Sequence, residues 1–294
     1  MGNKIESIIA EFDIPGFSNI SMIGDNEAVH NIDDKYILKR TAYFDQCKKS
    51  IELSNQLSQK DISVAKFIPL KNGLFYFQDE DFYYSLTHKI NGQPMNVDKG
   101  DYILNAKHIG ETAASLTLAL ENCECELCPD MDCIEILNDW VKFEIKKESL
   151  PVSKEMLDYL DSFEPLYRKL PRQIIHKDLN GGNILFDENM KFQGFIDFDI
   201  AEINARAYDI SYLLQCPFGC SNADKEHEIK QYIFESYNKI VCLTDEEKQA
   251  IPYFFAYIGI MLSAWFAKCG LKDLALSCAK GTGWSFENKH LFVC

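Results

Sequence analysis

Short apolar stretches separated by polar turns fill the first third of the chain, and helical periodicity fills the rest. Around residues 20–40, two apolar strands flank the turn residues 33–35, and the second strand ends near Lys39. Residues 74–78 and 82–90 repeat the strand pattern. The first third therefore predicts a small, strand-rich lobe.

Helical patterns occur once inside this lobe and dominate after it. Residues 43–59 place Phe44, Cys47 and Ile51 at i, i+3 and i+7, which predicts a helix with one apolar face. Core stripes of helical period follow Asp101, at Ile109, Ala113, Leu116 and Leu120 and at Ile134, Leu137, Val141 and Ile145.

Two local signals mark the limits of later helices. Pro165 interrupts a helical stretch that begins at Lys154. Thr244 and Glu247 form a capping box that opens another helix. The aromatic stretch at 253–267 is uncharged for fifteen residues, which is too short for a membrane span and suits a buried helix.

A turn-rich connector, Asn91-Gly92-Gln93-Pro94, separates the strand-rich part from the helical part. We therefore predict an α+β chain of two lobes, residues 1–90 and 91–294, with a small antiparallel sheet in the first and helices in the second.

Candidate chemistry concentrates between residues 173 and 199. His176, Asp178 and Asn183 stand in one loop, and Asp197 closes a hairpin that begins at Asn183, fourteen residues earlier. The H-x-D-x-x-x-x-N spacing followed by D-F-D matches a kinase catalytic loop and its metal-binding aspartate. Asp178 is placed to accept a hydroxyl proton, while Asn183 and Asp197 offer the hard oxygen ligands that Mg2+ prefers. The stretch predicts phosphoryl transfer.

These motifs, HKDLNGGNIL and GFIDFD, resemble those of the aminoglycoside phosphotransferase and homoserine kinase type II family, to which choline kinases and protein kinases are more distant relatives. The resemblance implies a two-lobed protein-kinase-like fold that uses ATP, with GTP as an alternative donor, and Mg2+. It also implies that His176 holds the catalytic loop. The loop departs from the usual HGDLHPGN at Lys177, Asn180 and Gly181, none of which removes a base or metal ligand.

In the first lobe the resemblance assigns a phosphate anchor. Lys39 would contact the nucleotide phosphates and be oriented by a glutamate of the next helix, where Glu52 is the only glutamate. An exposed lysine and a solvated glutamate are the structural alternative. The turn at Gly24 and Asn26 would cover the phosphates, although an ordinary hairpin loop fits these residues equally well.

The end of the first lobe is the expected purine site. In the resembling family adenine is bound through backbone groups of the connector between lobes, which places Leu86, Thr87 and His88 beside the purine. We expect His88 to be a partly exposed side chain of this connector rather than a base.

The segment after Asp197 favours a small acceptor over a protein substrate. The chain runs directly into a predicted helix without the A-P-E closure of a protein-kinase activation segment, and Asp209 comes after only twelve residues. Asp199 and Arg206 either face the acceptor or form structural ion pairs.

Charge limits the partners. Thirty basic against forty-five acidic residues give a formal charge of −15, which argues against binding nucleic acid or an anionic membrane and tolerates a cationic acceptor. The N-terminus lacks the pattern of a signal peptide, so we expect a cytoplasmic protein, either a monomer or a homodimer.

Four of the eleven cysteines, at positions 123, 125, 128 and 133, crowd into ENCECELCPDMDC. The segment is compact enough to wrap a zinc ion, but its spacing is not the usual pair-loop-pair pattern, and reduced thiols in a connector explain it as well. The sequence therefore leaves open whether a zinc ion is bound by these residues or whether they are reduced thiols: Cys123, Cys125, Cys128 and Cys133.

Two other functions compete with a small-molecule kinase. One is a catalytically silent, pseudokinase-like regulator that binds nucleotide, and the other is an interaction module built on a metal at the cysteine cluster. Within the kinase hypothesis, the acceptor is open among aminoglycosides, homoserine, amino alcohols and sugars, because scattered side chains set such pockets.

Overall fold

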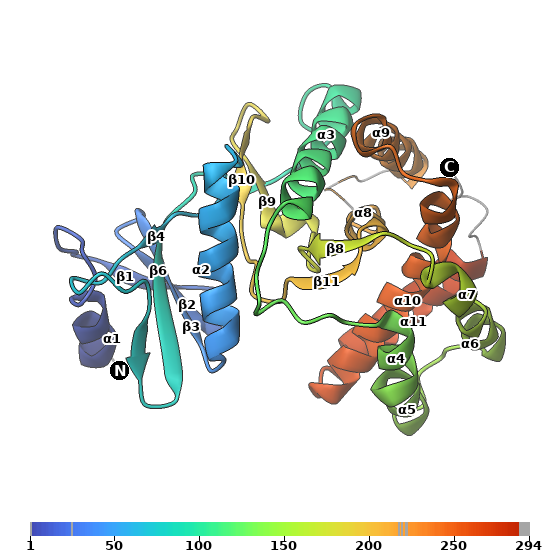
Figure 1. Cartoon of the computed structure of the whole chain (residues 1–294), viewed down its shortest axis with the longest axis horizontal. Helices are drawn as coiled ribbons and strands as arrows, with labels where there is room; N and C mark the ends of the chain where they lie inside the picture. The colour runs from blue at the N-terminus through green and yellow to red at the C-terminus, as the bar shows by residue number, and fades with distance from the viewer. Residues whose placement is uncertain (1, 25, 217, 219, 221–222, 288–294) are drawn as a thin grey trace. The chain divides into compact units, whose positions relative to one another are not determined.

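The structure is a computed structural model that describes residues 2–24, 26–216, 218, 220 and 223–287. By backbone contacts the chain divides into two compact units (Figure 1). Unit 1 draws on residues 1–95, 122–128 and 181–201, and unit 2 on residues 96–121, 129–180 and 202–294. Because both units are discontinuous in sequence, the predicted lobe boundary at residues 90 and 91 stays a prediction.

An antiparallel sheet forms the main part of unit 1, with its path in the order β1-β2-β3-β6-β4 and β5 paired to β6. The strands are β1 (Ile20–Ile23), β2 (Asn26–Ile32), β3 (Tyr36–Thr41), β4 (Phe67–Ile68), β5 (Phe77–Asp79) and β6 (Phe82–His88). The predicted turn between β2 and β3 is confirmed. Asp33 and Asp34 both have positive φ, 51° and 58°, which suits the right-handed twist of a tight hairpin.

The two faces of this sheet have different roles. Leu38 of β3 and Leu86 of β6 point into a core with Ile9 and Phe12, and all four are at most 1% exposed. The short helix α1 (Gly2–Ile9) belongs to this core. Since side chains alternate along a strand, the residues between them face the opposite side.

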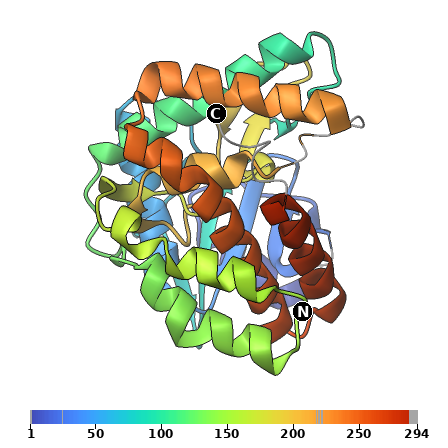
Figure 2. The same cartoon turned by 90° about the vertical axis from the view of Figure 1, so that its right-hand side faces the viewer.

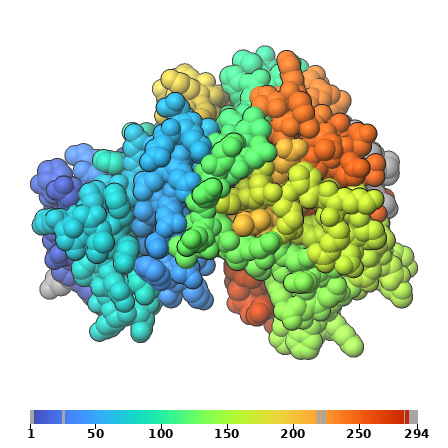
Figure 3. All heavy atoms as spheres, viewed as in Figure 1, coloured from blue at the N-terminus to red at the C-terminus, as the bar shows by residue number. Residues whose placement is uncertain are grey.

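Helix α2 (Phe44–Gln59) packs against β3 and β6 and confirms the helix predicted at 43–59 (Figure 1). Cys47, Ser50 and Ser54 are buried, at the i, i+3 and i+7 spacing of one face. Its outer face carries the exposed Asp45 and Lys48. The helix is seen in blue at the surface in Figure 3.

A smaller three-stranded sheet completes unit 1. Strands β9 (Ile184–Phe186) and β10 (Phe192–Phe195) form the predicted hairpin, and β7 (Gln93–Pro94) pairs with β9. The 3-10 turn η2 (Gly181–Asn183) leads directly into β9.

Unit 2 is mainly helical and confirms the predicted change of pattern after Asp101. Its helices are α3 (Tyr102–Glu121), α4 (Cys133–Ile136), the π-helical turn η1 (Leu137–Val141), α5 (Lys142–Lys147), α6 (Lys154–Asp161), α7 (Glu164–Tyr167), α8 (Ala207–Leu213), α9 (Ala223–Val241), α10 (Asp245–Lys268) and α11 (Lys272–Glu287). The capping box predicted at Thr244 and Glu247 opens α10.

One strand of unit 2 was not expected. The segment after Asp197 does not run directly into a helix, because Glu202–Ala205 first form β11, which pairs with β8 (Arg172–Ile175). The buried side chains of β11 include the polar Glu202 and Asn204, so the strand lacks the apolar pattern that identifies a strand in a sequence.

Helix α10 lies at the centre of the unit 2 core. Phe254 and Tyr257 are at most 1% exposed, and Phe163 stacks on Tyr253 with ring centroids 4.7 Å apart. By length and hydropathy α10 is, among the described helices, the candidate for a membrane span, but 67% of its most apolar window is buried inside the protein. Burial of this kind is expected of a core helix.

Helices α3 and α9 lie side by side (Figure 2). Gly110 permits this approach, because a Cβ atom there would come within 2.2 Å of both the Ser236 hydroxyl and the Ile233 carbonyl oxygen. At Gly281, in α11, a Cβ atom would meet nothing within 4 Å.

We expect Gly110→Ala to lower the free energy of unfolding by about 1–3 kcal/mol, since the two helices would have to separate. The control Gly281→Ala should raise it by about 0.5–1 kcal/mol, because alanine is the better helix former and the site is open. Chemical denaturation of both variants measures this, and equal effects of the two substitutions would contradict close helix packing at Gly110.

Candidate active site

A cavity of about 370 Å3 lies within unit 1, bounded by the free face of the sheet, by α2 and by the segment after β10. Its apolar walls include Val29, Ile37, Phe67, Ile90 and Leu185. Its polar lining includes Lys39, Ser50, Ser85, Asp197 and Asp199. The volume and the mixed lining are typical of a small-molecule site.

Lys39 lines this cavity and stands between two carboxylates. Its ammonium lies 2.9 Å from Asp197 and 2.7 Å from Asp199. Burial lowers the pKa of Lys39, but the charges of Asp199 and Asp197 oppose this and raise the pKa overall. The lysine is therefore held as a cation.

Asp199 has a further partner that sequence reasoning missed. The Ser50 hydroxyl donates to its carboxylate at 2.6 Å, so α2 holds this aspartate as well as lining the cavity. Ser50 lies one turn after Cys47 on the inward face of α2, and that helical phase was the only signal available in the sequence.

The predicted metal ligands Asn183 and Asp197 meet at one end of the β9–β10 hairpin. The Ile196 amide donates to the Asn183 carbonyl at 3.1 Å, next to Asp197. Asp197 has a positive φ of 70°, a conformation that is more common in aspartate than in most residues. The Asn183 backbone therefore lies next to Asp197, and the Asp197 carboxylate, which is paired with Lys39, is a hard oxygen ligand of the kind that Mg2+ prefers.

Glu52 was wrongly assigned as the partner of Lys39. It instead pairs with Lys48 at 3.6 Å and accepts a hydrogen bond from the Cys125 thiol at 3.3 Å. At 100° per residue, Glu52 lies about 140° around the helix from Cys47, so it points away from the cavity. The helix carries serine, not glutamate, on the face toward Lys39.

The residues predicted to lie beside the purine do not all face the same side of β6. The Leu86 side chain faces away from the cavity, since it is 0% exposed and belongs to the core on the other face of β6, and a purine contact through its backbone stays a prediction. Its neighbours Ser85 and Thr87 line the cavity, as period two requires. His88 lines the cavity and is exposed, as predicted.

The structure describes the β1–β2 turn only in part. Gly24 is exposed with a φ of 61°, which suits glycine, and it is not among the residues described as lining the cavity, although Ile23 is. The backbone of Asn26 begins β2. A phosphate contact by Gly24 or Asn26 stays a prediction.

In unit 2 a buried carboxylate fixes the predicted catalytic loop. Asp209, 2% exposed, accepts hydrogen bonds from the backbone amides of His176 at 2.7 Å and Lys177 at 2.9 Å. His176 itself is 0% exposed. Burial raises the pKa of Asp209 to about 6, although the neighbouring His176 and the two amides oppose the shift.

The predicted base Asp178 is held by two residues that sequence reasoning missed. The Asn180 amide donates to its carboxylate at 2.9 Å, and the Tyr212 hydroxyl is also hydrogen-bonded to it. Burial, followed by the charge of Asp178, raises the pKa of Tyr212. The orientation of Asp178 is therefore set from both its own loop and α8.

Arg206 forms a structural ion pair, one of the two alternatives. Its guanidinium donates to both carboxylate oxygens of Glu247, at 2.7 and 2.9 Å, and Glu247 is 0% exposed. Because Glu247 also closes the capping box of α10, Arg206 anchors the start of that helix.

The cysteine cluster is shared between the units. Cys125 and Cys128 are hydrogen-bonded to each other in unit 1, and burial raises the pKa of Cys128 to about 12. Cys133 contacts Asn204 in unit 2. Within the described part of the chain, no group of three or more His, Cys, Asp or Glu side chains is arranged to hold a metal ion.

Residues 20–233 match the family model described as the phosphotransferase enzyme family, a match that includes Lys39, the catalytic loop and Asp197. The chain belongs to this family. The resemblance inferred from HKDLNGGNIL and GFIDFD is thereby confirmed.

Curated relatives of this chain include kinases of two kinds. A homoserine kinase from Zymomonas mobilis subsp. mobilis is 33% identical over 151 residues, covering 48% of this chain and 44% of that protein. A probable aminoglycoside 3'-phosphotransferase from Lactococcus lactis subsp. lactis is 28% identical over 191 residues, covering 60% and 68%. The chain spans less than half the length of the homoserine kinases that it matches.

Solved structures confirm the protein-kinase-like fold of the chain. A microcompartment-associated aminopropanol kinase has a TM-score of 0.74 at 16% identity, covering 96% of this chain and 95% of its own. An amicoumacin kinase in complex with AMP-PNP and Ca2+ has a TM-score of 0.72 at 17% identity, covering 98% and 93%. The GDP complex of an aminoglycoside 2'-phosphotransferase has a TM-score of 0.70 at 16% identity, covering 98% of both chains.

The buried Asp209 predicts a pH dependence of stability. Its folded-state pKa of about 6 exceeds the ordinary value of 3.8, so the folded state binds the proton more tightly. The stability that this group adds is present below the ordinary value and is lost as the pH rises through about 6. From about pH 5 to about pH 7.5, the wild type should lose about 1 kcal/mol relative to Asp209→Asn.

Urea denaturation of both proteins across this range measures the difference. A difference that is constant, or that grows in favour of the wild type with rising pH, would contradict the burial of this carboxylate.

Proposed function

We propose that this phosphotransferase moves the γ-phosphate of a nucleoside triphosphate, ATP or GTP, to a hydroxyl group of a small amino alcohol. The observation that carries the proposal is the Lys39 cation held between Asp197 and Asp199 in a cavity with both apolar and polar walls. A cation beside hard carboxylates is what a metal-bound phosphate chain requires.

The residues of the cavity fit a nucleotide. Val29, Ile37 and Phe67 offer apolar surface for a purine, and Lys39 offers positive charge for phosphates. Asn183 and Asp197 would hold Mg2+ through oxygen atoms. When bound, the ion would neutralise charge on the phosphates that are being transferred.

The chain's own residues would divide the remaining work. Asp178, oriented by Asn180 and Tyr212, would accept the proton of the acceptor hydroxyl. Lys39 would exchange its aspartate partners for phosphate oxygens. His176 would keep the loop in place through its buried side chain and through the hydrogen bond from its backbone amide to Asp209.

The names of the relatives support an amino alcohol as the acceptor. Homoserine, aminoglycosides and aminopropanol all carry an amine and a hydroxyl. At neutral pH aminoglycosides and aminopropanol are cations and homoserine is a zwitterion, and a chain with a formal charge of −15 attracts the cationic acceptors. ATP and GTP stay equal candidates as donors.

The test is release of ADP from MgATP, and of GDP from MgGTP, across a panel of homoserine, aminopropanol, choline and aminoglycosides. We expect release with at least one acceptor. Asp178→Asn should reduce turnover by about two to four decades while nucleotide binding is unchanged, because the base is lost and the cavity is intact. Asp197→Ala should abolish turnover, because the metal ligand is lost.

Asp187→Asn is the matched control, since Asp187 caps the turn at the other end of the same hairpin through the Asn189 and Lys191 amides. It should leave turnover unchanged. Nucleotide binding by calorimetry without release on any acceptor would favour the silent regulator instead, and wild-type turnover in Asp197→Ala would falsify the site assignment.

A further inference from the structure

Lys177, directly before the proposed base, has an unusual backbone. Its φ is 72°, in the left-handed region that favours glycine, which occupies this position in the usual HGDLHPGN loop. A residue with a Cβ atom adopts this region only when its surroundings hold it there. The hydrogen bond from the Lys177 backbone amide to the Asp209 carboxylate supplies one such restraint.

The Lys177 side chain supplies a second restraint. Its ammonium lies 2.6 Å from the Glu202 carboxylate and 4.5 Å from the centre of the Tyr208 ring. The lysine side chain is 11% exposed and that of Glu202 is 7% exposed. A lysine whose charge only improved solubility would extend into water, whereas this one is withdrawn from it and paired.

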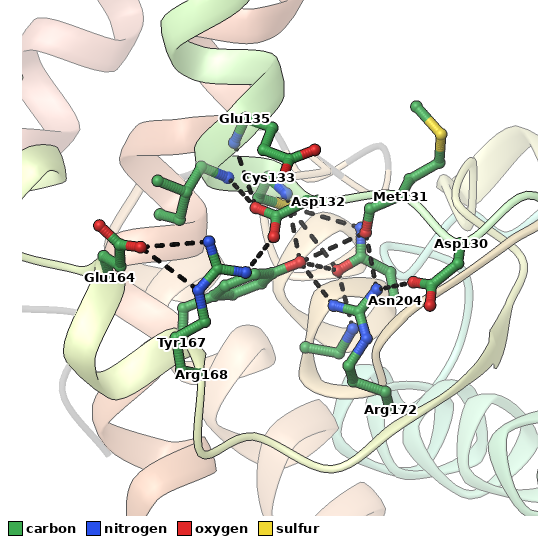
Figure 4. Close-up of polar contacts among 12 residues, drawn as sticks. Asp130, Met131, Asp132, Cys133, Glu135, Glu164, Tyr167, Arg168, Arg172 and Asn204 are labelled. Atoms are coloured by element: carbon green, nitrogen blue, oxygen red, sulfur yellow. Dashed lines mark hydrogen bonds and ion pairs between the residues drawn. The ribbon is translucent and has the colours of Figure 1, made fainter.

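Glu202 is fixed in turn by a chain of hydrogen bonds. Asn204 donates to the same Glu202 oxygen at 2.7 Å and accepts from the Tyr167 hydroxyl at 2.8 Å. Arg172 donates to that hydroxyl at 2.8 Å, and its second nitrogen donates to the Met131 carbonyl at 2.8 Å. Figure 4 shows Arg172, Tyr167 and Asn204 meeting at one point.

One end of the network is the Met131 carbonyl, and the other is the Glu202 carboxylate that faces Lys177. Arg172 and Asn204 belong to the paired strands β8 and β11, and the loop with Lys177 comes directly after β8. Because each member has a defined partner, the Glu202 carboxylate has little freedom to move away from Lys177. A rigid anion is thus available to hold the lysine.

We propose that Lys177 is a positioning residue for Asp178, clamped through its side chain by Glu202 so that a non-glycine residue keeps the left-handed turn that orients the base. This inference rests on the proposed function. The Lys177 ammonium is engaged with Glu202 and Tyr208, so its part in the reaction is to fix the peptide that carries Asp178.

The kinetic test compares Lys177→Met, Glu202→Gln and the double variant. Each single substitution should lower kcat by about 10- to 100-fold with the KM for nucleotide unchanged to within about twofold, because the base moves and the cavity does not. The double variant should be no slower than the slower single, since both break one clamp. Losses that multiply would overturn the clamp.

A pair of variants that differs by one methyl group isolates the backbone strain. Lys177→Gly combined with Glu202→Gln needs no clamp, because glycine adopts the left-handed turn freely. It should recover at least tenfold in kcat over Lys177→Ala combined with Glu202→Gln. Equal kcat in these two double variants would overturn the proposal.

Glu247→Gln is the matched structural control. It removes the charge of another buried carboxylate of unit 2 that is paired with a cation, and glutamine still fits the capping box. Its kcat should be unchanged even where its Tm falls as far as that of Glu202→Gln. An equal loss of kcat would mean that general destabilisation explains the Lys177 result.

Amide hydrogen exchange separates this inference from the proposed function. Lys177→Met should speed exchange at residue 177, whose amide is bonded to Asp209, by at least tenfold, while exchange in β3 is unchanged. This readout needs no turnover. A wild type that transfers phosphate to no acceptor would sink the proposed function, whereas unchanged exchange at residue 177 would overturn the clamp.

Discussion

A charge that is withdrawn from water must meet an opposite charge or several hydrogen bonds, and the chemistry-bearing residues of this protein are arranged by that requirement. Lys39 is bracketed by two aspartates, Asp209 accepts two backbone amides, and Lys177 meets Glu202. The buried Lys49 of α2 donates a hydrogen bond to the Ala201 carbonyl at 2.7 Å. Breaking one partner of a buried ion pair such as Lys177 and Glu202 costs about 3–5 kcal/mol, so this pair defines a geometry that is difficult to leave.

Within unit 1, helix α2 lines the cavity and also holds the segment that follows β10. One face presents Ser50 to Asp199, and Lys49 reaches the carbonyl of Ala201, two residues farther along the chain. The helix thus holds the segment after β10 through two hydrogen bonds. The aspartates that face Lys39 are fixed by a helix, a strand and their own ion pairs rather than by a loop alone.

The sequence predicted most of what depends on local signals. The Asp33-Asp34 turn, the capping box of α10, the extent of α2 and the hairpin between Asn183 and Asp197 are all determined by neighbouring residues. The family motifs identified the family for the same reason, because their spacing is contained in one short stretch.

The sequence was a poor guide where the direction of a side chain, or a contact between residues distant in sequence, determines the structure. Glu52 was chosen because it is the only glutamate of its helix, but its position around the helix turns it away from Lys39. The side chain of Leu86 points to the core, one residue out of phase with Ser85 and Thr87, which line the cavity. Tyr212 and Asp209, which hold the catalytic loop, lie more than thirty residues away in sequence, and no local pattern announces such a contact.

The left-handed Lys177 also constrains how this loop can change over evolutionary time. Lysine without Glu202 would leave a strained backbone and a buried cation, and Glu202 without lysine would leave a buried anion. A lineage that moves between glycine and lysine at this position therefore crosses a less stable intermediate unless both positions change together. Residues 177 and 202 are expected to be inherited as a pair, although twenty-four residues stand between them.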